Sequence, residues 1–150
     1  MANRNPPSRS DLHEIATSCA CRRLRGAARA VTRLYDDALR PTGLRATQFT
    51  LLVAAQLRGG ALISELAETL ALDRTSVTRE LSVLERRGLV SITPGEDRRA
   101  RVVEVTEDGE AALAAGYPRW REAQSRVLDG TEDRWAELAE RIAELEAVQG

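Results

Sequence analysis

Two groups of polar residues near the middle of the chain carry side chains suited to binding a polyanion. The first group lies on one side of the segment 74–86, where arginines and hydroxyl residues are interspersed. Its members are Arg74, Thr75, Ser76, Thr78, Arg79, Ser82 and Arg86. Arginine pairs with guanine edges and phosphates, and serine and threonine hydrogen bond to bases or phosphates. This group predicts a surface that reads duplex DNA, although a solvated helix face uses the same residue types.

The second group is a cluster of arginines a few residues further on, in the sequence GEDRRAR. Its members are Arg98, Arg99 and Arg101. Strand-forming residues flank the cluster at 89–93 and 101–105, with a Pro-Gly turn signal between the two runs. Arg98 and Arg99 would therefore lie at the tip of a hairpin, with Arg101 at the start of its second strand, where they could reach phosphates or a minor groove. Asp97 could equally hold one of them in a surface ion pair.

Helices must present the first group to a partner. The apolar stripe of the segment 74–86 consists of Val77, Leu81 and Leu84, which fall at i, i+4 and i+7. The polar residues named above lie across the helix from this stripe or beside it. Asp73 is the expected N-cap, and Gly88 is expected to end the helix. A shorter helix over 64–72, capped by Ser64, precedes it after a brief turn.

Two further helices are predicted before this pair. Apolar residues at helical spacing run from about 12 to 39, with Ser10 or Asp11 as the N-cap. A second helix is predicted over 47–57. It contains Phe49, the single phenylalanine of the chain, which we expect in the core.

Two helices are also predicted after the hairpin. Thr106 should cap the first of them, which Gly116 and Pro118 are expected to kink or interrupt. The last helix starts near Thr131 and carries apolar residues at spacings of three and four, namely Trp135, Leu138, Ile142 and Leu145. Such a stripe at the end of a chain needs a covering surface, which a second copy can supply. Packing within one chain is the alternative.

This order of residues resembles the MarR family of bacterial transcription regulators. The resemblance rests on LxxxLxLDRTSVTRxLxxLExRGLV, followed after a turn by DRRARxVxVTxxG, and extends over nearly the whole chain. It implies a mainly α fold with a small β-hairpin wing: a winged helix-turn-helix at about 47–105 between long dimerisation helices at about 11–40 and 106–148. Two subunits would interlock through these helices, with Leu12 and Ile15 joining the C-terminal stripe. The homodimer would present two recognition helices to a pseudo-palindromic site in double-stranded DNA, most simply as a repressor.

The charge of the chain is distributed unevenly. The formal net charge is −1, and every cation is an arginine because the sequence contains no lysine. Residues 1–103 hold 17 arginines against 11 acidic residues, whereas residues 104–150 hold 5 against 12. A basic N-terminal part can therefore face phosphates while an acidic C-terminal part faces solvent or a partner subunit.

The length of 150 residues allows one domain with a sizeable core, which we predict over 11–150. Residues 1–10 are expected to be disordered. The sequence has no apolar run long enough to span a bilayer and no charged-then-apolar leader. We therefore expect a cytoplasmic protein without a membrane partner.

The two cysteines, Cys19 and Cys21, fall in the first predicted helix. Residues two apart on a helix point about 200° from each other, so a disulfide between them is disfavoured. A disulfide would instead join two subunits or require local unwinding of the helix. The neighbouring arginines favour the thiolate of Cys21, which is the condition for reaction with peroxides. The alternative is an inert cysteine that serves as a small apolar residue.

The first helix also resembles that of the OhrR-type organic-hydroperoxide sensors within the MarR family. Cys21 lies eight residues before Arg29 of an Ala-Arg-Ala step, and Tyr35 is in register with one sensing tyrosine. The other tyrosine positions, at Arg25 and in the segment 44–47, are not matched. The resemblance implies a peroxide effector read by Cys21, Cys19 and Tyr35.

A small aromatic or carboxylic effector is the second hypothesis for what releases DNA. It would bind between the dimerisation helices and the winged core, and Tyr35, Trp120, His13 and the arginines of the first helix are candidates to line its pocket.

Other classes of protein find little support. With a single histidine, the chain offers at best the cluster His13, Cys19 and Cys21 for a metal, in poor helical geometry. The sequence shows no phosphate-binding glycine loop, no Ser/His/Asp set and no metalloprotease helix. We predict no enzyme activity and no cofactor. A thiol peroxidase would be the enzymatic alternative, and a winged helix that binds only other proteins is the alternative binding module.

Overall fold

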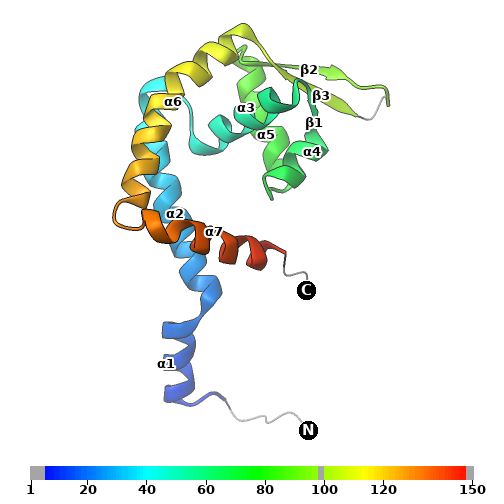
Figure 1. Cartoon of the computed structure of the whole chain (residues 1–150). Helices are drawn as coiled ribbons and strands as arrows, with labels where there is room; N and C mark the ends of the chain where they lie inside the picture. Colours follow the sequence, from blue (N-terminus) through cyan, green and yellow to red (C-terminus); the bar gives the residue numbers. More distant parts are fainter. Residues whose placement is uncertain (1–5, 98–99, 148–150) are drawn as a thin grey trace. The chain divides into compact units, whose positions relative to one another are not determined.

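The structure is a computed structural model that describes residues 6–97 and 100–147 (Figure 1). Its contacts divide the chain into two compact units, residues up to Leu34 and residues from Tyr35 onwards. The elements in chain order are α1 (Arg9–Ser18), α2 (Ala20–Leu39), the 3-10 turn η1 (Arg40–Thr42), α3 (Ala46–Arg58), β1 (Ala61–Leu62), α4 (Ile63–Thr69), α5 (Arg74–Arg86), β2 (Val90–Pro94), β3 (Arg101–Val105), α6 (Glu107–Leu128) and α7 (Glu132–Glu146).

Helices α3, α4 and α5 and the sheet enclose the hydrophobic core. Its fully buried large side chains are Leu39, Leu44, Leu51, Leu52, Leu66, Leu81, Leu84, Val77 and Val103. The predicted stripe of α5 is therefore entirely within this core, and Phe49 is only 5% exposed. A stripe at helical spacing buries one side of α5 and leaves its other side to solvent.

The sheet is antiparallel, with strand order β1-β3-β2. Strands β2 and β3 form the predicted hairpin, with Val90 opposite Val105 and Pro94 opposite Arg101. Strand β1 adds two residues to the other edge of β3, and α5 packs against β2. The predicted fold class, mainly α with a small β-hairpin wing, is confirmed.

The N-terminal region differs from the prediction of one helix over 12–39. Cys19 adopts φ −59° and ψ 109°, which is not helical, so α1 and α2 are separate helices. The N-cap of α1 is Ser8 rather than Ser10 or Asp11: Ser8 Oγ accepts from Asp11 N–H at 3.2 Å, and Ser8 N–H donates to Asp11 Oδ2 at 2.8 Å. This capping box starts the helix inside the segment predicted to be disordered.

Two other expected features are wrong in detail. Helix α4 begins at Ile63, so Ser64 is not its cap. Instead Glu65 Oε2 accepts from Leu62 N–H at 2.9 Å. Helix α6 runs continuously through Gly116 and Pro118, so of the two predicted alternatives, a kink or an interruption, the interruption does not occur.

The two glycines of α6 explain how closely this helix packs. A Cβ on Gly116 would lie 2.6 Å from the Phe49 ring, and a Cβ on Gly109 would lie 2.1 Å from the Leu89 carbonyl oxygen. The last glycine of the pattern DRRARxVxVTxxG is Gly109, and the close approach of α6 to the start of the hairpin requires it.

Candidate nucleic-acid interface

The start of α5 is fixed by Asp73. Its Oδ1 accepts from Ser76 N–H at 2.8 Å, which confirms the predicted cap. Hydrogen bonds from the Ser76 side chain and backbone hold the pKa of this carboxyl below its ordinary value of 3.8. At its other end the helix stops at Arg86, and Gly88 follows with φ +73°, as predicted. The cap secures the turn that carries Arg74 and Thr75.

The predicted DNA-reading residues of α5 share one accessible side. Arg74, Thr75, Thr78, Arg79 and Arg86 are exposed, while Ser76 and Ser82 are half-buried. Arg74, Thr75, Thr78 and Arg79 together line one shallow hollow at the start of the helix. The geometry therefore brings these four side chains together, with two guanidinium groups beside two hydroxyls.

The hydroxyl groups of this face have defined orientations. Thr78 Oγ1 donates to the Arg74 carbonyl at 2.8 Å, and Ser82 Oγ donates to the Thr78 carbonyl at 2.9 Å. Since each proton is held by the helix backbone, each oxygen presents acceptor lone pairs to a ligand. Acceptors suit the amino groups of adenine and cytosine, whereas the arginines supply donors for guanine and phosphate.

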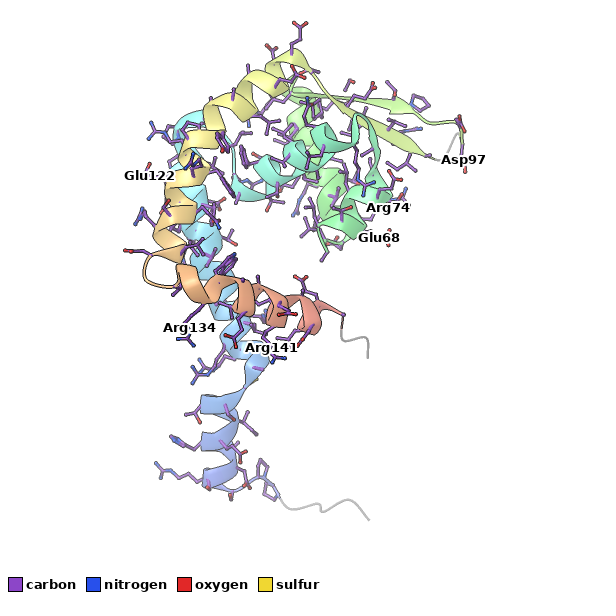
Figure 2. The ribbon with its side chains drawn as sticks, viewed as in Figure 1. Glu68, Arg74, Asp97, Glu122, Arg134 and Arg141 are labelled. Carbon is purple, nitrogen blue, oxygen red and sulfur yellow. The ribbon has the colours of Figure 1, made fainter. Side chains whose placement is uncertain are left out.

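The hairpin places a second polar segment at its far end (Figure 2). Asp97 lies at the tip, where Ala100 N–H donates to its carbonyl at 2.8 Å, and Gly95 N–H donates to the Ala100 carbonyl at 3.0 Å. Arg101 is exposed at the start of β3. Arg98 and Arg99 lie outside the described residues.

A polar cluster behind α5 was missed by the sequence interpretation. Glu80 lies between the buried residues Val77 and Leu84 and is only 8% exposed. Arg45 Nη2 donates to both of its carboxylate oxygens, at 2.9 and 2.8 Å, and Gln48 Nε2 donates to Oε2 at 3.0 Å. An acidic residue within an otherwise apolar stripe was the available signal, but its partners lie far away in the sequence.

A cavity of about 690 Å³ lies among α3, α4 and α6. Its lining is mostly apolar and consists of Phe49, Thr50, Val53, Ala54, Leu57, Arg58, Thr69, Leu70, Tyr117 and Trp120. The Tyr117 and Trp120 rings stack with centroids 6.2 Å apart. Trp120 therefore lines a cavity as expected. Tyr35 does not: its hydroxyl donates to Gln124 Oε1, and partial burial raises its pKa.

The cysteines lie at the break between α1 and α2. Cys19 is half-buried and is the C-cap of α1, Cys21 is exposed in the first turn of α2, and both are free thiols. Within the described part of the chain, no three His, Cys, Asp or Glu side chains are grouped so as to hold a metal ion. Over the same described residues, no helix is both long and apolar enough to cross a membrane.

The hydrophobic residues predicted at a dimer interface are accessible in the single chain. Leu12, Ile15, Leu138 and Leu145 are between 50% and 58% exposed, and Trp135 and Ile142 are half-buried. None of the described side chains of α1 or α7 is buried, and in α2 only Leu39 is. These three helices therefore leave large apolar surfaces uncovered within the chain.

Comparisons with known proteins agree on one class. The profile of the MarR family matches residues 42–100. MosR of M. tuberculosis, a transcriptional regulator solved in complex with DNA, is 41% identical, with 85% of this chain and 93% of that chain covered and a TM-score of 0.78. The repressor NicR of Pseudomonas putida is 32% identical over 96 residues, 63% of this chain and 61% of its own length. CouR of Rhodococcus jostii, solved with p-coumaroyl-CoA, is 27% identical, with 81% and 86% covered and a TM-score of 0.70.

The fold and the exposed face of α5 thus define a winged helix-turn-helix protein. The chain belongs to the MarR family. It spans about three fifths of the length of the curated relatives that it matches. The curated relatives and MosR are each described as transcription regulators.

Proposed function

We propose that this protein is a transcription repressor that binds a pseudo-palindromic operator as a homodimer and is released by an effector. The exposed side of α5 carries the proposal, because two arginines and two hydroxyls converge there on a helix whose opposite side is fixed in the core. A major groove admits a helix and offers donors and acceptors to such side chains. The MosR complex with DNA and the repressor name of NicR support the same function.

The hairpin is the second DNA contact in this proposal. Helix α5 packs against β2, so the wing extends from the same small core as the recognition helix. Arg101, with Arg98 and Arg99 outside the described residues, would contact phosphates or a minor groove beside the major groove occupied by α5. A winged helix that only docks proteins would instead show an apolar patch over Thr75, Arg79 and Ser82.

The helices that bury few side chains within one chain support the proposed dimer. Helix α2 has twenty residues, all of them described, and only Leu39 of these is buried. Leu138 and Leu145 of α7 are 50% and 52% exposed. Exposed apolar stripes on long helices mark interaction surfaces, and two identical copies would bury them while presenting two α5 helices to half-sites about 10 base pairs apart or a multiple of this distance.

The decisive experiment is selection of bound sequences from a random duplex pool with the purified full chain. We expect enrichment of an inverted repeat whose half-sites are spaced by whole helical turns. The stoichiometry of the complex, measured by light scattering, should be two chains per operator. Recovery of no enriched sequence, or of a site without inverted symmetry, contradicts the proposal.

The cavity among α3, α4 and α6 is the proposed effector site. Its stacked Tyr117 and Trp120 rings and its largely apolar wall favour a flat aromatic ligand, and Arg58 at the wall offers a charge for a carboxylate. Binding of p-coumaroyl-CoA by CouR supports an aromatic ligand in this family. Titration of p-coumarate and related aromatic acids should quench Trp120 fluorescence in wild type. Trp135→Phe should keep the quenching and Trp120→Phe should lose it.

An oxidant is the second candidate effector, favoured by the exposed thiol of Cys21 beside the non-helical Cys19. The Cys21 thiolate would attack an organic hydroperoxide, breaking the O–O bond to give a sulfenic acid and an alcohol. Condensation with the Cys19 thiol would then release water and form a disulfide. Cumene hydroperoxide should release DNA from wild type and leave Cys21→Ser bound. An unchanged gel shift after oxidation would exclude this effector.

A further inference from the structure

We infer that Arg45, Gln48 and Glu80 form a positioning cluster that sets the orientation of the recognition helix α5 for DNA reading. The inference rests on the proposed DNA binding and concerns residues that do not themselves face the DNA. Glu80 is buried on the core side of α5, whereas the neighbouring Arg79 is exposed on the outer side. The two residues are adjacent in sequence, so any rotation of α5 that moves one moves the other.

The contacts of Glu80 are specific in direction. Arg45 Nη2 donates to Oε1 at 2.9 Å and to Oε2 at 2.8 Å, and Gln48 Nε2 donates to Oε2 at 3.0 Å. Apolar side chains such as Leu81 and Leu84 fill space without fixing an angle, whereas charge-assisted hydrogen bonds have narrow geometry. Among the contacts between α5 and α3, the hydrogen bonds to Glu80 are therefore the best suited to fix the rotation of α5 about its own axis.

The partners of Glu80 are themselves anchored at the start of α3. Arg45 is the N-cap of this helix, and its N–H donates to Gln48 Oε1 at 3.1 Å, so the Gln48 amide is held from both ends. The next N–H, of Ala46, donates to Asp36 Oδ1 in the last turns of α2 at 2.7 Å. The start of α3 thus connects the end of a proposed dimerisation helix to the middle of the recognition helix.

A positional role and a purely electrostatic role predict opposite results for Glu80→Gln. Loss of a negative charge beside DNA should by itself strengthen binding to every sequence. Loss of the ion pair should instead weaken binding to the selected operator, because α5 is no longer held at one angle. We expect the ratio of operator affinity to scrambled-duplex affinity to fall about tenfold, with scrambled-duplex affinity unchanged or slightly higher.

The matched control is Glu85→Gln, which removes the same charge from an exposed position of the same helix. It should leave the affinity ratio as in wild type. The Arg45 side chain is 59% exposed, so Arg45→Gln should fold. Each single variant should lower the ratio of operator affinity to scrambled-duplex affinity, and the double variant Arg45→Gln/Glu80→Gln should lower it by less than the product of the two single factors. Fluorescence anisotropy at fixed salt, with operators selected by wild type, measures all four variants. Equal affinity ratios for Glu80→Gln and Glu85→Gln would overturn the inference. So would a double variant whose affinity ratio falls by the full product of the two single factors.

Hydrogen exchange without DNA separates this inference from the proposed function. Glu80→Gln should speed exchange in α5 and the first turn of α3 while the other core amides keep wild-type rates. Faster exchange throughout the core would show general destabilisation and contradict a positioning role. Failure of wild type to select any DNA would overturn the proposed function and with it the role of the cluster in DNA reading. The exchange measurement does not depend on DNA, so it would still show whether the cluster holds α5 in position.

Discussion

At the scale of single residues, the two sides of α5 differ in burial. Val77, Leu81 and Leu84 are fully buried, while Arg74 and Arg79 remain exposed. Substitutions of the exposed residues should therefore change binding with little effect on folding, since surface changes away from caps and packing cost little stability.

Arg79→Ala is expected to lower operator affinity by about 1–3 kcal/mol and to relax sequence preference at one position of each half-site. The reason is that a guanidinium in the hollow at the start of α5 can form a bidentate contact with a base edge. Selection from a random pool with the variant measures the lost preference. Arg134→Ala, exposed on α7, is the control and should leave the preference unchanged. An identical selected motif for Arg79→Ala would contradict the assigned face.

The cap at Asp73 gives a prediction for pH. Its pKa is held below the ordinary value of 3.8 in the folded chain, so its stabilising effect is present above about pH 4 and is lost as pH falls through the lowered pKa. Asp73→Asn, which keeps an acceptor but does not titrate, should lose less helix in α5 over this acid range. Hydrogen exchange of the first α5 amides between pH 3 and 6 measures the difference. If the exchange rates of the first α5 amides change with pH in the same way in wild type and Asp73→Asn, this cap does not cause the loss of helix at low pH.

At the scale of elements, α6 depends on backbone contacts that leave no room for a side chain. Gly109 lies against the Leu89 carbonyl oxygen and Gly116 lies against the Phe49 ring. Both contacts join α6 to the winged core, so the placement of this helix against α3 and the hairpin depends on them.

Gly109→Ala is expected to destabilise the protein by about 1–3 kcal/mol, because the new Cβ would lie 2.1 Å from a backbone oxygen and the helix must shift. Thermal unfolding should show a midpoint lower by several degrees. Gly26→Ala is the matched control. It adds the same methyl group within α2, where a Cβ meets no atom within 4 Å, and should not lower the midpoint. Equal midpoints for the two variants would contradict the close contact.

At the scale of the whole molecule, function should require two chains. Helices α1 and α7 leave Leu12, Ile15, Leu138 and Leu145 at least half exposed in one chain. Two half-sites bound by linked recognition units hold the complex far more strongly than one.

Leu138→Glu is expected to raise the dissociation constant of the dimer by at least about tenfold, because burial of a leucine is replaced by burial of a charge. Sedimentation over a concentration series measures the constant, and operator affinity should fall with it. Glu140→Gln, also on α7 but off the apolar stripe, should leave the dissociation constant of the dimer and the operator affinity unchanged. A monomeric wild type at micromolar concentration would contradict this arrangement.

The sequence by itself determined the elements that depend on local order. Helical spacing located α5 and its two sides, Asp73 and Gly88 marked its ends, and a turn signal between two apolar runs located the β2–β3 hairpin. Caps, glycines and periodicity act over a few residues, so they can be read without knowledge of the tertiary structure.

Only the tertiary structure decided the features that join distant segments. Arg45 and Glu80 are 35 residues apart, and the cavity combines side chains from α3, α4 and α6. The same holds for the reason that Gly109 must be a glycine, since the Leu89 carbonyl reaches it only through packing. Such contacts depend on how helices and strands are placed against each other, and periodicity along one element carries no information about the identity of its neighbours.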